Sequence, residues 1–508
     1  MRVLFIYFNR YIRPRTQLSL SLLETIVKNS GHKTQIFDTS FYESVIDSSE
    51  ATMVAAGIHK KVGGLKIDIK KSDILIDFLR VINEFNPDLI AFSFYSIDID
   101  LHKKLLPFVK RQFPKIKIVC GGPTACINPA SCFEGRYVDM VCAGEGENLI
   151  LELCDKIDHG KDIDDIRGLW IIKDGNIINN GITKLTDISK LPIQNWDSYD
   201  PIHMYGMFEG RAYKMGHVEN MRGCPFNCSY CGSGSIKKYY ESSGNSKYLR
   251  FKTAEQIVLE CEILKNKYGL EIFYFTVGTF TAMPISMFRE LSDLYSKRVG
   301  LPFIALVHPM TINEEVAYLL KKMGCIHVSV GVESGVEEFR EKIFNRKMSN
   351  EKIIKCIRLL RDNDIHVSTY NIIGVPGMDR EHVFKTIELN KIARPHSSLV
   401  SVLIPFPDAD ITKNLIRRGI IKMEDIQHIG SGLYPTIEIK EMSQKEINGL
   451  YNTFNLYVKF PRILYPIIKI LEKENVITRV IRKIFYKILE AERTIHLLLL
   501  RRKIKKER

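Results

Sequence analysis

Residues 221–232 have the sequence MRGCPFNCSYCG, and this stretch decides the fold of the second half of the chain. Cys224, Cys228 and Cys231 form a C-x3-C-x2-C pattern in a loop rich in turn-forming residues. Three thiolates so close in the sequence can converge on one inorganic centre from one side. Structural zinc is the alternative, but it normally takes four ligands in two pairs, and no second pair follows at a useful spacing. An iron-sulfur cubane usually takes four thiolates, so three would leave one iron open to a chelating substrate.

Strand-like and helix-like segments alternate downstream of this loop. Between Val218 and about Pro405 the apolar runs and amphipathic stretches make about six β/α repeats. A closed barrel of this type needs eight repeats, so the pattern predicts an open, partial (β/α)6 barrel.

A second alternation of strands and helices precedes the loop, from Arg2 to about Ile150, and it predicts a doubly wound parallel sheet. Turn-forming and small polar residues follow three of its strands. In sheets of this kind ligands bind at the carboxyl ends of the strands. The candidate residues at that edge are Ser93, Ser96, Gly121, Gly122, Thr124, Gly144 and Glu145.

The pattern predicts four regions along the chain. An α/β sheet domain is expected over residues 1–165, and a small hairpin and a proline-marked linker over 166–200. The partial barrel is expected over 201–420, followed by a helical, basic region over 421–508.

Charge and cysteine usage limit the class of protein. The 508-residue chain has a net charge of +14, and residues 461–508 carry fourteen basic and five acidic residues, a local excess of nine. No run of apolar residues is long enough to span a membrane, and the N-terminus has no cleavable leader pattern. Eleven cysteines without an export signal indicate a reducing compartment, so we expect a cytoplasmic protein.

The basic C-terminal region has three interpretations: a solvated helical face, an anionic membrane surface or nucleic acid. Aliphatic and aromatic residues alternate there with Lys and Arg, and one apolar helical stripe is expected from Ile477, Ile481, Ile484, Phe485 and Ile488. This alternation favours peripheral contact with the inner face of a membrane over RNA, because basic amphipathic helices bind lipid headgroups while burying their apolar side.

The cysteine loop resembles that of the radical S-adenosylmethionine (radical SAM) superfamily, which has this spacing and an aromatic residue, here Tyr230, before the last cysteine. The resemblance implies a 4Fe-4S cluster on the three cysteines and S-adenosylmethionine (SAM) on the open iron. Positions matching SAM contacts in related enzymes follow the strands. They are Tyr230, Gly232, Glu333, Ser334, Arg346 and Asn371. Alternatively, Glu333 caps a helix and Arg346 is a solvated surface charge.

A Rossmann-like domain before a radical SAM barrel resembles the cobalamin-dependent members of the superfamily, over roughly residues 1–420. The resemblance implies that the seven loop residues at the edge of the first sheet contact cobalamin. The Asp-x-His-x-x-Gly loop that supplies a histidine to cobalt in other cobalamin proteins is absent, so we expect no histidine on the lower face. A vestigial sheet that binds nothing is the alternative.

The chain departs from its relatives at one place. They often carry an acidic pair in a strand ending F-x-D-D-x-F, whereas residues 275–280 have the sequence FTVGTF. Val277 and Gly278 therefore replace two carboxylates at the mouth of the barrel.

The function implied is methylation of an unactivated carbon of a small-molecule or lipid-like substrate, with an electron donor such as flavodoxin or ferredoxin as partner. The alternatives are a cobalamin-dependent cyclisation or rearrangement, a methylthiotransferase acting on tRNA, and a non-catalytic corrinoid or metal-binding protein. Nucleic acid is not an expected partner, and the sequence does not indicate which residues are catalytic.

Overall fold

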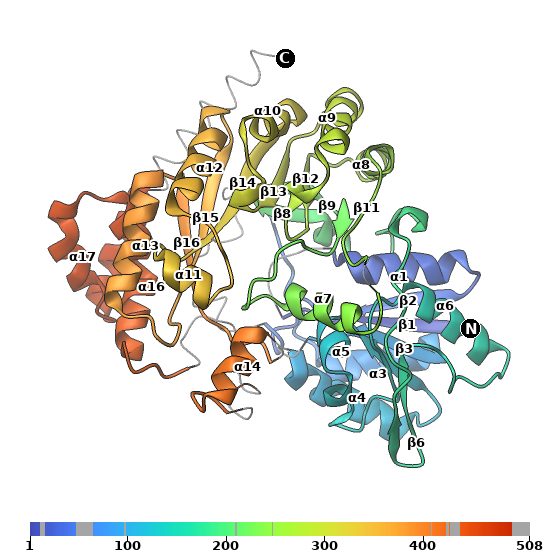
Figure 1. Cartoon of the computed structure of the whole chain (residues 1–508). Coiled ribbons are helices and arrows are strands. Elements are labelled where there is room, and N and C mark those ends of the chain that lie inside the picture. Colours follow the sequence, from blue (N-terminus) through green and yellow to red (C-terminus); the bar gives the residue numbers. More distant parts are fainter. Residues whose placement is uncertain are drawn as a thin grey trace. The chain divides into compact units, whose positions relative to one another are not determined.

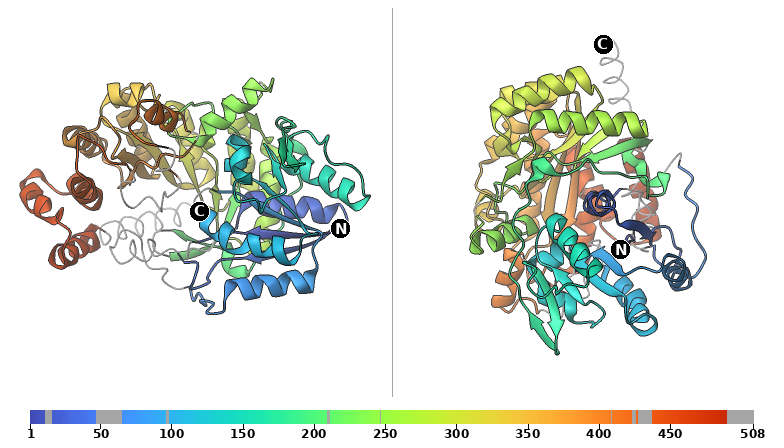
Figure 2. Two further views of the ribbon diagram at one scale, coloured as in Figure 1. Left: turned by 90° about the horizontal axis from the view of Figure 1, so that it is seen from below. Right: turned by 90° about the vertical axis from the view of Figure 1, so that its right-hand side faces the viewer.

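The structure is a computed structural model that describes residues 1–10, 16–46, 65–95, 98–208, 211–245, 247–407, 409–422, 426 and 437–489 (Figures 1 and 2). The chain forms two compact units. The first contains the described residues of 1–207 together with 232–251, and the second contains those of 208–231 and from 252 onward.

The first unit is built on a seven-stranded sheet with the order β2-β1-β3-β4-β5-β6-β7. The first five strands in this order are parallel, and β6 and β7 are antiparallel at one edge. Strand β1 is almost completely buried because both faces of a parallel sheet are covered by helices. The strands are β1 (Arg2–Tyr7), β2 (Lys33–Asp38), β3 (Leu89–Ser93), β4 (Lys117–Gly121), β5 (Met140–Cys142), β6 (Leu169–Lys173) and β7 (Asn176–Ile178).

Helices cover both faces of this sheet, so the predicted doubly wound architecture is confirmed. Helices α3 and α4 pack together on one face, and α1 and α6 pack together on the other (Figure 1). The helices are α1 (Leu18–Asn29), α3 (Ile74–Phe85), α4 (Ile99–Gln112), α5 (Pro123–Ile127), η2 (Pro129–Phe133), α6 (Glu147–Asp158), η3 (Ile188–Lys190) and η4 (Pro201–Met204).

Two segments of the first unit lie where the sequence pattern did not place them. The predicted hairpin is present, but β6 pairs with β5, so it extends the first sheet. Residues 232–251, with α7 (Gly232–Ser242) and β11 (Arg250–Phe251), also belong to this unit. The predicted domain boundaries are not tested by this division and stay predictions.

The second unit contains a curled seven-stranded sheet with the order β16-β15-β14-β13-β12-β9-β8. Six of these strands, from β9 to β16, pair in parallel, as expected for a partial (β/α)6 barrel. The strands are β8 (Tyr205–Phe208), β9 (Arg211–Val218), β12 (Ile272–Phe275), β13 (Phe303–Val307), β14 (Cys325–Glu333), β15 (His366–Ile373) and β16 (Ser397–Val402), and a short β10 (Met221–Arg222) follows β9.

The helices between these strands pack on one side of the curled sheet (Figure 1). Their ends follow the sequence: Thr253 and Gln256 form a capping box at the start of α8, and Gly269 ends α8 in the left-handed conformation. The helices are α8 (Ala254–Tyr268), η5 (Phe280–Ala282), α9 (Ile285–Arg298), η6 (Pro309–Thr311), α10 (Glu314–Met323), α11 (Glu337–Lys342), α12 (Asn350–Asp362) and α13 (Arg380–Ala393).

The C-terminal region of the second unit is helical, as predicted. Helix α16 packs on α13 and β16, and its apolar residues join the core of this unit. In the part of the chain that the structure describes, no helix is long and apolar enough to cross a membrane. The helices are α14 (Asp410–Arg417), α16 (Gln444–Lys459), η7 (Arg462–Leu464), α17 (Tyr465–Leu471) and a helix over 476–489. The part of the predicted basic region beyond residue 489 lies outside the described residues.

Candidate active site

The cysteine loop is anchored to the segment that follows α11. The Ser229 amide donates to the Phe344 carbonyl oxygen at 3.0 Å, and the Asn345 side-chain amide donates to the Asn227 carbonyl oxygen at 2.8 Å. The Tyr230 ring packs edge-on against the Phe344 ring, with centroids 5.3 Å apart. These contacts fix the loop beside the residue that comes next, Arg346.

Arg346 joins the cysteine loop to the carboxyl end of β14. Its guanidinium donates to the Cys228 Sγ at 3.3 Å, to the Tyr230 hydroxyl at 3.3 Å and to the Gly331 carbonyl oxygen at 2.8 Å. The Tyr230 hydroxyl in turn donates to the Glu333 Oε1 at 2.8 Å. Four residues predicted to hold the cluster or SAM therefore form one network. Arg346 is buried and is not a solvated surface charge, and Glu333 is buried with its carboxylate bound to Tyr230.

Burial sets the protonation of this network. It raises the pKa of the Glu333 carboxyl, against the opposing effects of Arg346 and the Tyr230 hydrogen bond. It also raises the pKa of Tyr230, which stays a neutral donor. For Arg346, burial lowers the pKa, but Tyr230, Glu333 and Cys228 outweigh it, so the net shift is upward. The guanidinium is a fixed positive charge beside a cluster ligand.

The end of β14 is shaped to present Glu333 to this network. Glu333 has φ +65°, a conformation that non-glycine residues rarely adopt, and the pairing with β15 shifts register between Gly331 and Glu333. A Cβ atom on Gly331 would lie 2.5 Å from the Glu333 Oε1. Such local strain persists only where surrounding contacts enforce it and is typical of ligand sites.

Cys224 faces the loop that follows β12. Its Sγ lies 3.9 Å from the Thr279 Oγ1, and a Cβ atom on Gly278 would lie 3.9 Å from the same sulfur. The position at which relatives often carry an acidic residue therefore lies directly opposite a predicted cluster ligand.

His308 follows β13 and packs on the cysteine loop, although sequence reasoning did not select it. Its ring stacks on Phe226, with centroids 3.6 Å apart, and its Nδ1 accepts the Met310 amide at 3.2 Å. Burial lowers the pKa of His308, and Arg346 lowers it further, so the ring is neutral with its proton on Nε2. The rule that site residues follow the carboxyl ends of parallel strands would have found both His308 and Thr279.

The structure does not gather the three thiols into one cluster. Cys224 and Cys228 are partly buried, whereas Cys231 is exposed. Among the described residues no three Cys, His, Asp or Glu side chains are grouped closely enough to hold a metal ion. The three cysteines nevertheless suit an iron-sulfur cluster, because their thiols share one short loop. The positive charge of Arg346 also stabilises the thiolate form of Cys228, which is the form that binds iron.

Two of the predicted SAM contacts are engaged elsewhere in the second unit. Ser334 is completely buried, and its hydroxyl accepts the Val336 amide at 3.2 Å. The Asn371 side chain donates to the Leu399 carbonyl oxygen at 2.8 Å and accepts from the Asn390 side chain at 2.9 Å. Both side chains therefore hold the barrel together in this structure. Gly232 is the first residue of α7 and belongs to the first unit.

Four of the predicted cobalamin contacts lie at the carboxyl edge of the first sheet. Ser93 ends β3, Gly121 ends β4, and Gly122 and Thr124 lie at the start of α5. Gly122 has φ +93°, and a Cβ atom there would lie 2.3 Å from the Ser93 Oγ. Glycine is thus required by the close approach of the two loops to each other. Ser96 lies outside the described residues.

The last predicted loop of this edge is occupied by the chain itself. A Cβ atom on Gly144 would lie 2.5 Å from the Tyr240 hydroxyl of α7. The Glu145 carboxylate accepts two hydrogen bonds from Arg250, one of them at 3.0 Å, and the Thr186 amide at 2.7 Å. Ser93, Gly121, Gly122 and Thr124 are the described candidates that remain to line a corrinoid, and Gly144 and Glu145 hold residues 232–251.

Comparison with known families matches both halves of the chain. Residues 42–153 match the B12 binding domain, and residues 218–389 match the radical SAM superfamily. The first match spans β3, β4 and β5 of the first sheet, and the second spans β12, β13, β14 and β15 of the curled sheet. The chain belongs to the cobalamin-dependent radical SAM family.

Several proteins of known or assigned function are similar to this family member. An uncharacterized methyltransferase of Pyrococcus horikoshii is 26% identical over 80% of this chain and 85% of its own. The anaerobic magnesium-protoporphyrin IX monomethyl ester cyclase of Rubrivivax gelatinosus is 24% identical over 70% of this chain and 64% of its own. The hopanoid C-3 methylase of Methylococcus capsulatus is 25% identical over 71% of this chain and 68% of its own.

The fold is also that of a solved family member. The radical SAM methyltransferase TsrM of Kitasatospora setae, solved with tryptophan and a SAM analogue, superposes with a TM-score of 0.65. It covers 82% of this chain and 76% of its own, at 17% identity. The chain is a radical SAM enzyme, and the cofactors of its family are a 4Fe-4S cluster, SAM and cobalamin.

Proposed function

We propose that this radical SAM enzyme methylates an unactivated carbon of a small-molecule or lipid-like substrate. The supporting observation is the Arg346 network, which joins a predicted cluster cysteine to two predicted SAM contacts at the mouth of a partial barrel. When bound, the reduced cluster would supply the electron that cleaves SAM to a hydrogen-abstracting radical, and cobalamin would supply the methyl group, which a second SAM would replace.

The residues of the chain have separate tasks in this proposal. Cys224, Cys228 and Cys231 hold the cluster. Arg346 positions Cys228 and offers a planar cation that suits the carboxylate of SAM. Glu333, held by the Tyr230 hydroxyl, is an acceptor suited to the amino group or ribose of SAM.

The stacked pair of Phe226 and His308 covers the cysteine loop with apolar surface and one N–H donor. Exclusion of water there would protect a reactive carbon radical from side reactions. In the first unit, Ser93, Gly121, Gly122 and Thr124 would line the corrinoid. Cleavage of SAM consumes one electron, so a donor such as flavodoxin or ferredoxin completes the proposal.

The test uses the full chain, reconstituted without oxygen with iron and sulfide. We expect roughly four irons per chain, the content of one cubane, and release of a corrinoid on extraction. With SAM and reductant the enzyme should form 5'-deoxyadenosine, and S-adenosylhomocysteine should accompany it if methyl transfer occurs. Alanine at Cys224, Cys228 or Cys231 should abolish both products. The matched control is Cys356→Ala, which removes a buried thiol from α12 and should keep its iron.

The alternatives predict different outcomes in the same experiment. 5'-Deoxyadenosine without S-adenosylhomocysteine would favour cyclisation or rearrangement. A second cluster without corrinoid would favour a methylthiotransferase. Zinc in the cysteine loop, or SAM cleavage that survives loss of the cysteines, would refute the proposal.

A further inference from the structure

The helices after α16 expose a series of large aliphatic side chains. They lie on η7, α17 and the helix over 476–489, and each is nearly half exposed or more. Ile463 and Ile477 reach 83% and 72% exposure. Residues 463–488 therefore carry an unusual amount of apolar surface in contact with solvent. We refer to the following residues as the aliphatic surface: Ile463, Ile467, Ile470, Val476, Ile477, Val480, Ile484 and Ile488.

This surface is not the face that packs on the core. In the helix over 476–489, Ile481 and Phe485 are partly buried against the core of the second unit, and the Phe485 ring meets the Phe460 ring at 5.0 Å. Ile484 and Ile488 are exposed on another side of the same helix. The sequence predicted one apolar stripe here, whereas the structure divides it into a packed face and an exposed face.

The positive charge around the aliphatic surface is not neutralised by nearby carboxylates. Glu472 is bound by Arg380 and Tyr457, and Glu474 is bound by Arg482. Arg482 itself is buried and donates to the Leu471 carbonyl oxygen. The exposed lysines of these helices form no ion pair with any described residue. They are Lys469, Lys473, Lys483 and Lys487.

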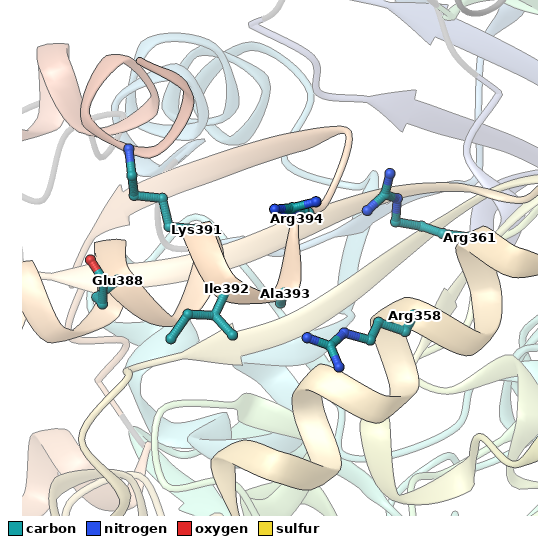
Figure 3. A pocket seen from close by; sticks show the side chains of 7 residues that line it. All are labelled: Arg358, Arg361, Glu388, Lys391, Ile392, Ala393 and Arg394. Carbon is teal, nitrogen blue, oxygen red and sulfur yellow. The ribbon is translucent and has the colours of Figure 1, made fainter. Parts of the chain in front are cut away.

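A cationic hollow of about 600 Å³ lies beside the start of this region, between α12 and α13 (Figure 3). Arg358, Arg361 and Arg394 line it, and none of the three forms an ion pair with a described residue. Glu388, which also lines the hollow, is bound by Arg462 at 2.8 Å, and Arg462 directly precedes Ile463. The hollow therefore adds unneutralised positive charge next to the aliphatic surface.

We propose that the aliphatic surface docks on a bilayer that contains anionic phospholipid. Exposed Ile and Val side chains would enter the boundary between headgroups and acyl chains, while the lysines and the arginines of the hollow meet lipid phosphates. A second copy of this chain is the less suitable occupant, because a symmetric contact would bring unneutralised positive charges together. The proposed contact does not depend on the proposed reaction.

The experiment measures co-sedimentation of the full chain with vesicles of phosphatidylcholine, with and without about one third phosphatidylglycerol. We expect binding only to the anionic vesicles, and weaker binding as salt is added. The variant I467S/I470S/I477S should lower the apparent affinity at least about tenfold, because three apolar anchors are lost. The variant K483E/K487E should remove the preference for phosphatidylglycerol.

Matched controls distinguish binding through the aliphatic surface from non-specific adsorption to vesicles and from unfolding. Ile76→Ser removes an aliphatic side chain with 66% exposure from α3 of the first unit and should leave vesicle binding unchanged. The substituted Ile and Lys positions are all exposed, so the unfolding temperature of these variants should stay the same. R358Q/R361Q should weaken the preference for phosphatidylglycerol, and an unchanged preference would show that the hollow is not part of the contact.

Absence of vesicle binding, or wild-type binding by I467S/I470S/I477S, would overturn the proposal. So would a dimer in solution that this variant dissociates.

Discussion

The Arg346 guanidinium lies 3.3 Å from the Cys228 Sγ and donates to it. A residue predicted from its position to approach SAM is therefore also in contact with a predicted cluster ligand. Two further N–H groups of the guanidinium are directed to the Tyr230 hydroxyl and the Gly331 carbonyl oxygen, and its Nε has no partner among the described residues. Because a guanidinium has five N–H groups in one plane, it can serve the protein and still offer donors to a carboxylate.

Arg346→Lys should keep the charge but lose most of this network. An ammonium is a point donor and cannot reach three acceptors in different directions at once. We expect SAM cleavage to fall at least about tenfold while the iron content is kept, since lost planar recognition is worth about 1–3 kcal/mol. The measurement is the rate of 5'-deoxyadenosine formation. Arg289→Lys, at a half-exposed surface position in α9, is the control and should have no effect. An unchanged rate in Arg346→Lys would contradict the role given to the guanidinium.

Tyr230→Phe should leave the Glu333 carboxyl buried without its hydroxyl donor. Loss of one partner from a buried polar pair costs about 1–3 kcal/mol. We therefore expect a lower unfolding temperature before any cofactor is added. Tyr318→Phe removes a hydroxyl from a side chain with 59% exposure and should leave the temperature unchanged. Equal stability of the two variants would show that the Tyr230 hydroxyl bond contributes little.

Residues 232–251 should depend on one partly buried ion pair for their place in the first unit. Arg250 and Glu145 are about 15% exposed, and the carboxylate also accepts the Thr186 amide. Glu145→Gln leaves the guanidinium without its charge partner, and because the pair is partly buried the cost should exceed the roughly 1 kcal/mol of an exposed pair but stay below the roughly 3–5 kcal/mol of a fully buried one. We expect faster hydrogen exchange in α7, read by mass spectrometry.

The control for this prediction is Glu338→Gln, which breaks an exposed, solvent-screened pair with Lys342 and should leave the stability unchanged. In the double variant E145Q/R250Q the loss should be smaller than the sum of the two single losses, since the pair is coupled. Additive losses would show that the two residues act independently.

The order of strands and the cysteine loop could be predicted from the sequence because their signals are local. Apolar runs and turn residues repeat within short windows, and three cysteines fall within one loop. The partners of individual side chains are not local. Nothing in the neighbourhood of Glu145 indicates Arg250, and the sequence pattern instead suggested that Glu145 faces cobalamin.

The apolar pattern of residues 477–488 shows a second limit. Ile477, Ile481, Ile484, Phe485 and Ile488 recur at helical spacing and suggested a single face. Hydrophobic periodicity records which residues are apolar but not how wide a face the neighbouring helices can cover. The packing of Ile481 and Phe485 against the core shows which part of the pattern is buried.

His102 should make the stability of the first unit dependent on pH. Its ring is completely buried among Phe8, Phe92 and Phe94, with centroids 4.3–4.9 Å away, and neither ring nitrogen has a hydrogen-bond partner among the described residues. Burial lowers its pKa to about 3. In the unfolded chain the ring titrates near its ordinary value of about 6.5. Below that value the unfolded state binds a proton that the folded state does not, so stability falls as the pH falls from about 6.5 toward 3.

For a single histidine, the free energy of unfolding should be about 1.4 kcal/mol lower at about pH 5.5 than at about pH 7.5. His102→Leu should remove this contribution and also stabilise the unit near neutral pH, because an unsatisfied polar group leaves the core. The measurement is chemical denaturation at the two pH values. His159→Leu, at a side chain with 59% exposure, should behave like the wild type. An unchanged pH dependence in His102→Leu would assign the acid sensitivity to other groups.

Gly278→Asp should restore a carboxylate at the mouth of the barrel and slow SAM cleavage. A Cβ atom at this position meets nothing closer than the Cys224 side chain at 3.9 Å, so the new side chain can be accommodated. Its negative charge would lie near the bound cluster, where it opposes the entry of an electron. At about 6 Å and an effective dielectric constant of about 20, the repulsion is about 1–3 kcal/mol, equivalent to a tenfold or larger fall in rate. Gly278→Ala is the matched control, because it adds the Cβ atom without the charge and should keep the wild-type rate of 5'-deoxyadenosine formation. If the two variants cleave SAM equally fast, the charge at this position does not govern reduction, and the loss of the acidic pair in this chain reflects the substrate.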